Sequence, residues 1–189
     1  MTEADDFLAE VRAAMFGMEA RIRDDILREL ASHIAEATAS RGDVGSALAE
    51  FGPARQVGRE YRRVYGFGKG FVLLFAAVAF LLAIPSAPVL QVTEEFPIPN
   101  VLAFPLIFVL VAWVLWVSVA AGSRAGLLAG LAGFGGRIVV EVWLALTPPF
   151  PVPTASGLAL FLASGLLLLL VGWLPGTAKK AWSGPSGNL

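Results

Sequence analysis

The sequence predicts an all-α membrane protein in which a small N-terminal cytoplasmic helical bundle precedes a four-helix transmembrane bundle. The charged residues are divided unequally, because 22 of them precede position 71 and only five lie between Phe71 and Leu174. The chain is 57% hydrophobic with a mean hydropathy of +0.72, whereas soluble domains contain roughly 45–50% apolar residues. Four apolar runs after residue 70 are each long enough to cross a bilayer. These observations exclude an ordinary soluble globule.

Residues 1–68 form the predicted head, and its first two helices are expected over 3–15 and 19–40. Thr2 can cap the first helix, whose opening turn carries acidic residues that suit the positive end of the helix dipole. Gly42 is a typical C-terminal stop for the second. Apolar residues recur at helical spacing in both segments. They are Phe7, Leu8, Val11 and Met15 in the first helix, and Ile22, Ile26, Leu30, Ile34 and Ala37 in the second.

Two shorter helices complete the predicted head. Asp43 can cap a helix that ends at Gly52, and Pro53 suits the first position of a helix over 53–65. Each has one apolar face, so four short helices can pack into a small bundle. The residues expected to face inward are Val44, Ala47, Leu48 and Phe51, then Val57, Tyr61 and Val64.

The head contains a run, Ile26-Leu-Arg-Glu-Leu-Ala-Ser-His-Ile-Ala-Glu-Ala37, that is followed by Leu48-Ala-Glu-Phe-Gly-Pro53 and then by Val57 and Tyr61. With these motifs, residues 5–65 resemble the HAAS-type helical domain and the similar permease-prefix domain. Pro53-Ala54 departs from many members, in which an acidic residue precedes the proline. The resemblance implies a cytoplasmic domain ahead of transmembrane helices. It also implies a membrane-anchored regulatory or adaptor role, since members with four or more spans often accompany PadR-like transcription regulators.

His33 is the only histidine, with Glu29 and Glu36 at helical spacing from it. A zinc site needs three or four nitrogen or sulfur ligands, and the chain has no cysteine, so we expect neither a metal site nor a cofactor. We instead expect His33 at the border of the buried stripe, hydrogen-bonded to a neighbouring helix or loop. The predicted spans also lack a Ser-His pair, an Asp-Asp pair or a metal cluster, which disfavours an intramembrane enzyme.

Basic residues gather just before the first span, at Arg59, Arg62, Arg63 and Lys69. Because Glu60 interrupts this row and residues 1–70 contain ten basic against twelve acidic residues, nucleic-acid binding is disfavoured. We expect these side chains to contact lipid headgroups. The glycines that follow, Gly66, Gly68 and Gly70, predict a hinge between the head and the membrane region.

The membrane domain is predicted over 69–176, with spans at about 71–90, 101–121, 125–147 and 155–174 and a cytoplasmic tail over 177–189. Lys and Arg near the span ends all fall on one side of the membrane under this topology, and loops 86–100 and 148–154 contain none. The positive-inside rule therefore places both termini in the cytoplasm of a multi-pass protein of the cell membrane.

The third span carries Arg137 and Glu141, four residues apart and near its midpoint. Isolated charges are costly there, so this face should be buried as a charge pair. We favour a structural role in helix packing or partner choice, and a proton or ion relay or a polar substrate site is the alternative. Small residues on the same helix allow close approach of a neighbour. The expected packing glycines are Gly126, Gly130, Gly133 and Gly136.

Two functions remain open from these observations. In the first, the head binds a cytosolic or membrane partner protein, such as a PadR-like regulator, and the spans hold it at the membrane. In the second, the chain is a small transporter or permease subunit that uses the Arg137–Glu141 pair. A single four-span bundle has little polar surface, so the second function requires a homo-oligomer.

Overall fold

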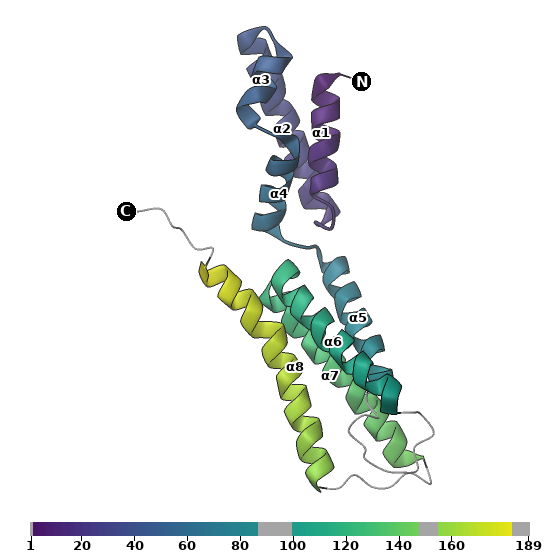
Figure 1. The fold of residues 1–189 in the computed structure, drawn as a ribbon. Coiled ribbons are helices and arrows are strands. Elements are labelled where there is room, and N and C mark those ends of the chain that lie inside the picture. Colours follow the sequence, from purple (N-terminus) through teal and green to yellow (C-terminus); the bar gives the residue numbers. More distant parts are fainter. Residues whose placement is uncertain (1, 87–99, 148–154, 183–189) are drawn as a thin grey trace. The chain divides into compact units, whose positions relative to one another are not determined.

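The computed structural model describes residues 2–86, 100–147 and 155–182, and within these ranges it contains eight α-helices and no strand. The expected all-α fold is therefore confirmed for the part of the chain that is described. The chain divides into two compact units, Met1–Phe71 and Val72–Leu189 (Figure 1).

The head unit contains α1 (Glu3–Ala14), α2 (Ala20–Arg41), α3 (Val44–Phe51) and α4 (Ala54–Tyr65). Thr2 and Asp5 form a capping box at the start of α1, and the Asp43 carboxylate accepts the Ser46 backbone N–H at the start of α3. Gly42 ends α2 in the left-handed conformation, with φ of 75°, where glycine has no steric cost. Pro53 precedes α4 as its N-cap and is not its first helical residue.

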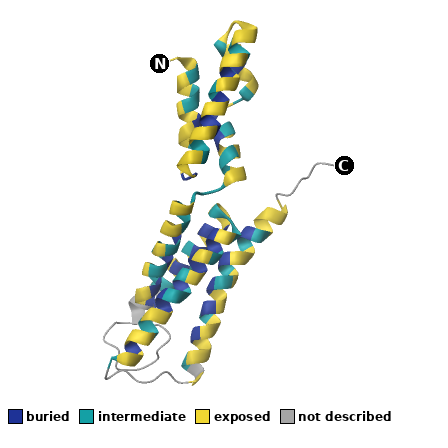
Figure 2. Cartoon of the chain, turned by 180° about the vertical axis from the view of Figure 1, so that it is seen from behind, coloured by how far each residue is buried: buried dark blue, intermediate teal, exposed yellow. Residues whose placement is uncertain are grey.

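The head core lies where the apolar stripes of α1, α2 and α4 meet, as the dark blue residues in Figure 2 show. It consists of Val11, Met15, Met18, Ile26, Leu27, Leu30, Ile34 and Ala54. The prediction for Val64 is wrong, because its side chain is 78% exposed. The crossing of the two helices explains this. Gly58 of α4 lies against Val11 and Ala14, near the end of α1, so the last turn of α4 continues beyond the helix that covers it.

The membrane unit contains α5 (Lys69–Ser86, whose first turn belongs to the head unit), α6 (Asn100–Ala121), α7 (Ser123–Leu146) and α8 (Ala155–Trp182). α7 packs against α6 and α8, and α5 contacts α6 where the Trp113 indole N–H donates to the Phe75 carbonyl at 3.1 Å. By length and apolar composition, α5, α7 and residues 157–182 of α8 can each cross a membrane, whereas the apolar stretch of α6 counted from Pro105 is shorter. These helices indicate a membrane protein.

The last helix is longer than the sequence indicated, because α8 continues through Pro175 to Trp182. The span was expected to end at Leu174, and the tail to begin at residue 177. A proline removes a helical hydrogen bond, but neighbouring groups can compensate for it inside a membrane protein. Here the Gly176 N–H donates to Ser118 Oγ at 3.0 Å, and Lys179 Nζ donates to the Val119 carbonyl at 2.8 Å. The predicted end of the first span, 87–90, and the tail beyond Trp182 lie outside the described residues.

Candidate functional site

Arg137 is the polar centre of the membrane unit, and its side chain is completely buried. Nη1 donates a hydrogen bond to Ser164 Oγ on α8 at 2.7 Å, and the Ser164 hydroxyl in turn donates to the Phe161 carbonyl at 2.7 Å. The guanidinium carbon also lies 5.5 Å from the centre of the Phe161 ring, within the range of a cation–π interaction. Arg137 therefore ties α7 to α8 at mid-helix.

The other two nitrogens of this guanidinium, Nε and Nη2, have no hydrogen-bond partner among the described residues. Glu141 lies one turn further along α7 and attracts the positive charge. Buried donors without acceptors are costly, and charged ones more so. The arrangement concentrates positive charge inside the unit, where it can fix helix packing or attract an anionic group.

Ser164 is the functional partner that sequence reasoning missed. Ser164 lies well inside α8 and was not among the residues singled out from the sequence. In the sequence, Ser164 is one small residue within an apolar run. Its position along α8 therefore does not identify it as a partner of Arg137. Only the packing of α7 on α8 brings the two side chains together.

The glycines expected at helix contacts lie on the buried face of α7. A Cβ atom on Gly126 would come within 2.1 Å of the Gly172 carbonyl oxygen, and one on Gly130 within 2.6 Å of the Leu168 oxygen, both on α8. One on Gly136 would come within 2.7 Å of the Phe80 oxygen on α5. Gly133 has only ordinary contacts, the nearest at 3.4 Å.

Two glycines of α8, Gly172 and Gly176, are at equally close contacts but were not anticipated. A Cβ on Gly172 would lie 2.4 Å from the Gly126 oxygen, and one on Gly176 would lie 2.5 Å from the Ser123 nitrogen. Their four-residue spacing is the GxxxG pattern of close helix pairs, so the sequence did contain a usable signal.

The predicted hinge is shorter than the three glycines suggested. Gly66 ends α4 with φ of 72°, whereas Gly70 lies within the first turn of α5. Gly68 is packed, because its N–H donates to the Gly17 carbonyl at 2.8 Å and a Cβ there would meet the Glu19 backbone at 2.9 Å. The non-helical connection is thus residues 66–68, and it is held against the turn between α1 and α2.

The basic residues of α4 fall into two groups. In the first, Arg55 pairs with Glu10 of α1 at 2.6 Å, and Arg59 Nε donates back along α4 to the Arg55 carbonyl at 3.1 Å. In the second, the Arg62 guanidinium lies 5.8 Å from the centre of the Phe67 ring, and Arg63 and Lys69 are exposed. The expected set of Arg59, Arg62, Arg63 and Lys69 is therefore not one continuous patch.

His33 is exposed rather than at the edge of the core, with 59% of its side chain accessible. Its Nε2 lies 3.9 Å from the Glu29 carboxylate one turn earlier on α2, so the expected bond to a neighbouring helix is replaced by an intrahelical contact. Over the described residues, no group of three His, Cys, Asp or Glu side chains is placed to hold a metal ion.

An open groove of about 440 Å³ lies between α1 and α2 on the head. Apolar side chains of Leu8, Ala9 and Leu27 line it together with charged groups of both signs. Arg12 and Asp24 face each other across the two helices at 4.0 Å. The complete lining is Asp5, Leu8, Ala9, Arg12, Asp24, Leu27 and Arg28.

Comparison with known proteins identifies the head. The HAAS family model matches residues 6–60, from the first turns of α1 to the middle of α4. The N-terminal region is therefore a HAAS-type domain, as its motifs indicated, and it is fused to apolar helices. Neither the curated proteins nor the solved structures contain a match to this chain.

Proposed function

We propose that this chain is a membrane-anchored adaptor or regulatory protein. Its head binds a cytosolic partner, and α5 to α8 hold that partner at the cell membrane. The observation that carries the proposal is the HAAS match, which falls within a compact head unit that is followed by apolar helices. The role requires no catalysis, and we propose that the chain is not an enzyme.

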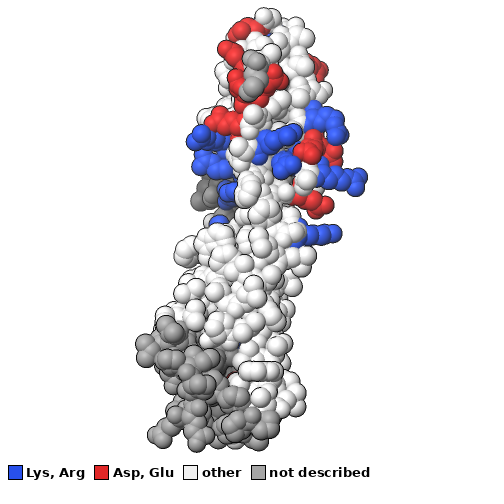
Figure 3. All heavy atoms as spheres, turned by 90° about the vertical axis from the view of Figure 1, so that its right-hand side faces the viewer, with Lys and Arg blue, Asp and Glu red and all other residues white. Residues whose placement is uncertain are grey.

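The proposed topology has four spans and two cytoplasmic ends. Its support is the position of the basic residues, which flank α5, α7 and the end of α8 at Lys69, Arg124 and Lys179. The predicted outer loops contain no Lys or Arg, as the positive-inside rule requires. On the face seen in Figure 3, the charged side chains lie on the head and the second unit is almost entirely uncharged.

The groove between α1 and α2 is the proposed site of partner binding. Its lining combines apolar side chains with charged groups of both signs, and protein interfaces combine apolar and polar contacts in the same way. The ion pairs there are exposed, so their residues can change partner at little cost. The resemblance to HAAS domains indicates the class of partner, a PadR-like regulator.

Filling the groove tests this proposal. Ala9 is exposed on the groove wall, so Ala9→Trp should block the partner without disturbing the core. Ala49→Trp, at an exposed position on α3, is the matched control. The full chain in lipid nanodiscs is titrated with a purified PadR-like regulator. We expect Ala9→Trp to weaken binding at least tenfold and Ala49→Trp to leave it unchanged. Equal affinities for all three proteins would refute the groove as the site.

The alternative is a transporter or permease subunit, and the buried Arg137 with two unbonded nitrogens favours it. A relay would need Glu141 to change its protonation. Glu141→Gln should therefore abolish proton or solute flux in proteoliposomes if the chain transports. Unchanged flux together with an altered unfolding midpoint would leave Arg137 and Glu141 with a structural role alone.

A further inference from the structure

The end of the head that leads into α5 presents large apolar side chains to its surroundings. Phe16 is 65% exposed, Val64 78% and Tyr65 53%. They come from two separate segments, since Phe16 follows α1 and the other two end α4. Single exposed apolar residues are ordinary, but a group at one end of a domain marks an interaction surface.

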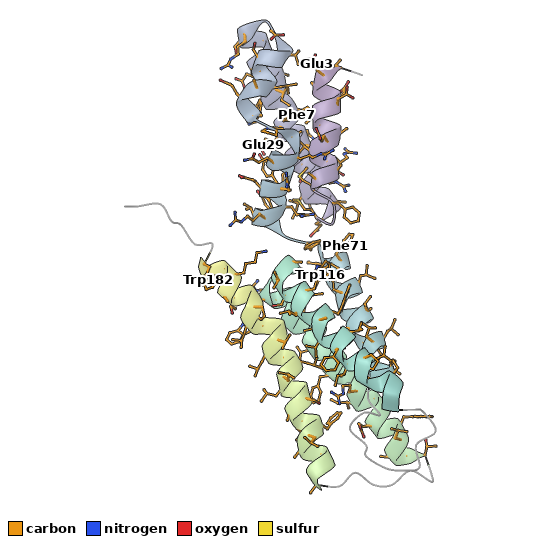
Figure 4. All side chains as sticks on the ribbon, in the orientation of Figure 1. Glu3, Phe7, Glu29, Phe71, Trp116 and Trp182 are labelled. Carbon is orange, nitrogen blue, oxygen red and sulfur yellow. The ribbon has the colours of Figure 1, made fainter. Side chains whose placement is uncertain are left out.

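Phe16 belongs to an aromatic cluster at the start of α5. The Phe16 and Phe71 rings meet edge to face at 5.3 Å, and the Phe67 and Phe71 rings lie 6.1 Å apart. Phe67 also packs on Gly17, whose φ of 89° keeps the turn after α1 tight. Figure 4 shows Phe71 on the first turn of α5. The cluster is therefore a built part of the head and not a flexible linker.

Connectivity places this cluster at the membrane boundary. α5 begins at Lys69 and is an 18-residue helix that is apolar enough to cross a bilayer. Phe71 is its third residue and lies about 3 Å along the axis from Lys69 at a rise of 1.5 Å per residue, so side chains that touch Phe71 are near the start of this helix. Aromatic side chains are favoured at that depth, where one side of the ring is apolar and the other is hydrated.

Between Glu60 and Glu94 every charged residue is basic, and the exposed Glu19, whose backbone lies against Gly68, is the acidic residue next to this segment. The basic residues in this interval are Arg62, Arg63 and Lys69. Arg62 stacks on Phe67, and Arg63 and Lys69 are exposed. On the face seen in Figure 3, basic side chains gather on one half of the head, with some acidic side chains among them. Anionic headgroups complement this combination of positive charge and apolar side chains.

We infer that Phe16, Val64 and Tyr65, together with Arg62, Arg63 and Lys69, form a lipid-seating surface. On this surface the head rests against an anionic membrane. The basic groups bind headgroup phosphates, and the apolar side chains enter the boundary between headgroups and acyl chains. Arg59 is not part of the surface, because its guanidinium turns back to the Arg55 carbonyl. The inference does not depend on the partner-binding groove.

The absence of cysteine makes the test direct, since a nitroxide can be attached at one chosen position. Ala13→Cys is the probe, because Ala13 is exposed on α1 three residues before Phe16 and far in sequence from α5. Ala49→Cys on α3 reports the opposite part of the head, and Leu74→Cys reports insertion of α5. The full chain is placed in nanodiscs of phosphatidylcholine, with or without phosphatidylglycerol. Collision rates with oxygen and with a water-soluble nickel complex give the depth.

With phosphatidylglycerol we expect the oxygen-to-nickel collision ratio at Ala13 to exceed that at Ala49 several-fold. Arg63→Gln with Lys69→Gln should abolish the increase caused by phosphatidylglycerol, whereas Arg59→Gln should preserve it. Phe16→Ser should lower the ratio in both lipids, with circular dichroism confirming the same helix content. A water-like ratio at Ala13 in both lipids would overturn the inference. If Leu74 also reads as aqueous, the membrane anchoring itself has failed.

Discussion

The head and the membrane unit use opposite side chains at their helix contacts. In the head, large residues such as Met15, Ile26 and Leu30 are buried and charged residues cover the surface. In the membrane unit, glycine and alanine occupy many of the closest contacts of α7, and large residues such as Leu128 and Leu166 face outward. Water drives large apolar side chains inward, whereas lipid does not, so helices in lipid gain from close backbone approach.

The two units also treat buried polar groups differently. Ion pairs of the head are at its surface, where each contributes little to stability. The membrane unit buries Arg137 with one hydrogen bond to Ser164. The head is therefore stabilised by the burial of apolar side chains. The membrane unit combines close helix packing with the buried contact between Arg137 and Ser164, in which a charged group is costly to bury.

The largest expected effect tests the apolar burial. Leu30→Ala should destabilise the head by about 2–5 kcal/mol, because it leaves a cavity in the core. Leu166→Ala on the outward face of α8 should change the stability of the membrane unit by less than about 0.5 kcal/mol. Hydrogen exchange of α2 amides measures the first, and denaturant unfolding in micelles the second. Equal losses would remove the contrast between the units.

The next effect tests the close approach of α7 and α8. Gly126→Ala should cost about 1–3 kcal/mol, because the new Cβ meets the backbone of Gly172 and cannot be relieved by a side-chain rotation. Gly135→Ala, on the same helix, meets nothing within 4 Å and should be neutral or slightly stabilising. The measurement is the unfolding midpoint of each variant in the same detergent, and we expect a lower midpoint for Gly126→Ala than for Gly135→Ala. Similar midpoints would show that the helices can move apart freely.

A smaller effect tests the polar contact. Ser164→Ala removes the acceptor of Arg137 Nη1 and should destabilise the membrane unit by about 1 kcal/mol. In an Arg137→Met background, Ser164→Ala should lower the unfolding free energy by less, because no buried Arg137 N–H group is left without an acceptor. A double-mutant cycle on unfolding free energy measures the difference. Identical costs in both backgrounds would mean that Ser164 acts only through its bond to the Phe161 carbonyl.

The smallest effect concerns pH and belongs to the head. Hydrogen bonds from the Ser46 backbone N–H and hydroxyl lower the pKa of Asp43 below 3.8. Because the folded pKa is the lower one, this contribution to stability is present above the unfolded value of about 3.9 and disappears as the pH falls through the folded pKa. A circular-dichroism titration should show Asp43→Asn with a weaker loss of helix in that acidic range than the unsubstituted chain. An unchanged titration would place the acid sensitivity elsewhere, for example at Asp5.

Local signals in the sequence accounted for most helix boundaries of the head. Thr2, Gly42 and Asp43 act on their immediate neighbours, and the structure places helix ends within about two residues of the predicted ones. Local signals gave a wrong prediction where the outcome depends on a residue far away in the sequence. Val64 lacks a covering helix, and Pro175 lies within α8, where Ser118 accepts the Gly176 N–H. The partner of Arg137 was missed for the same reason.

The sequence by itself determined the division of charge, the HAAS motifs, the all-α fold and the apolar character of the later helices, because these follow from composition and short-range periodicity. Only the tertiary structure decided which side chains meet. It joined Arg137 to Ser164, set Gly126 against Gly172 and brought Phe16 onto Phe71. Such contacts depend on how helices cross, and crossing is set by the packing of whole surfaces rather than by residue spacing along one helix.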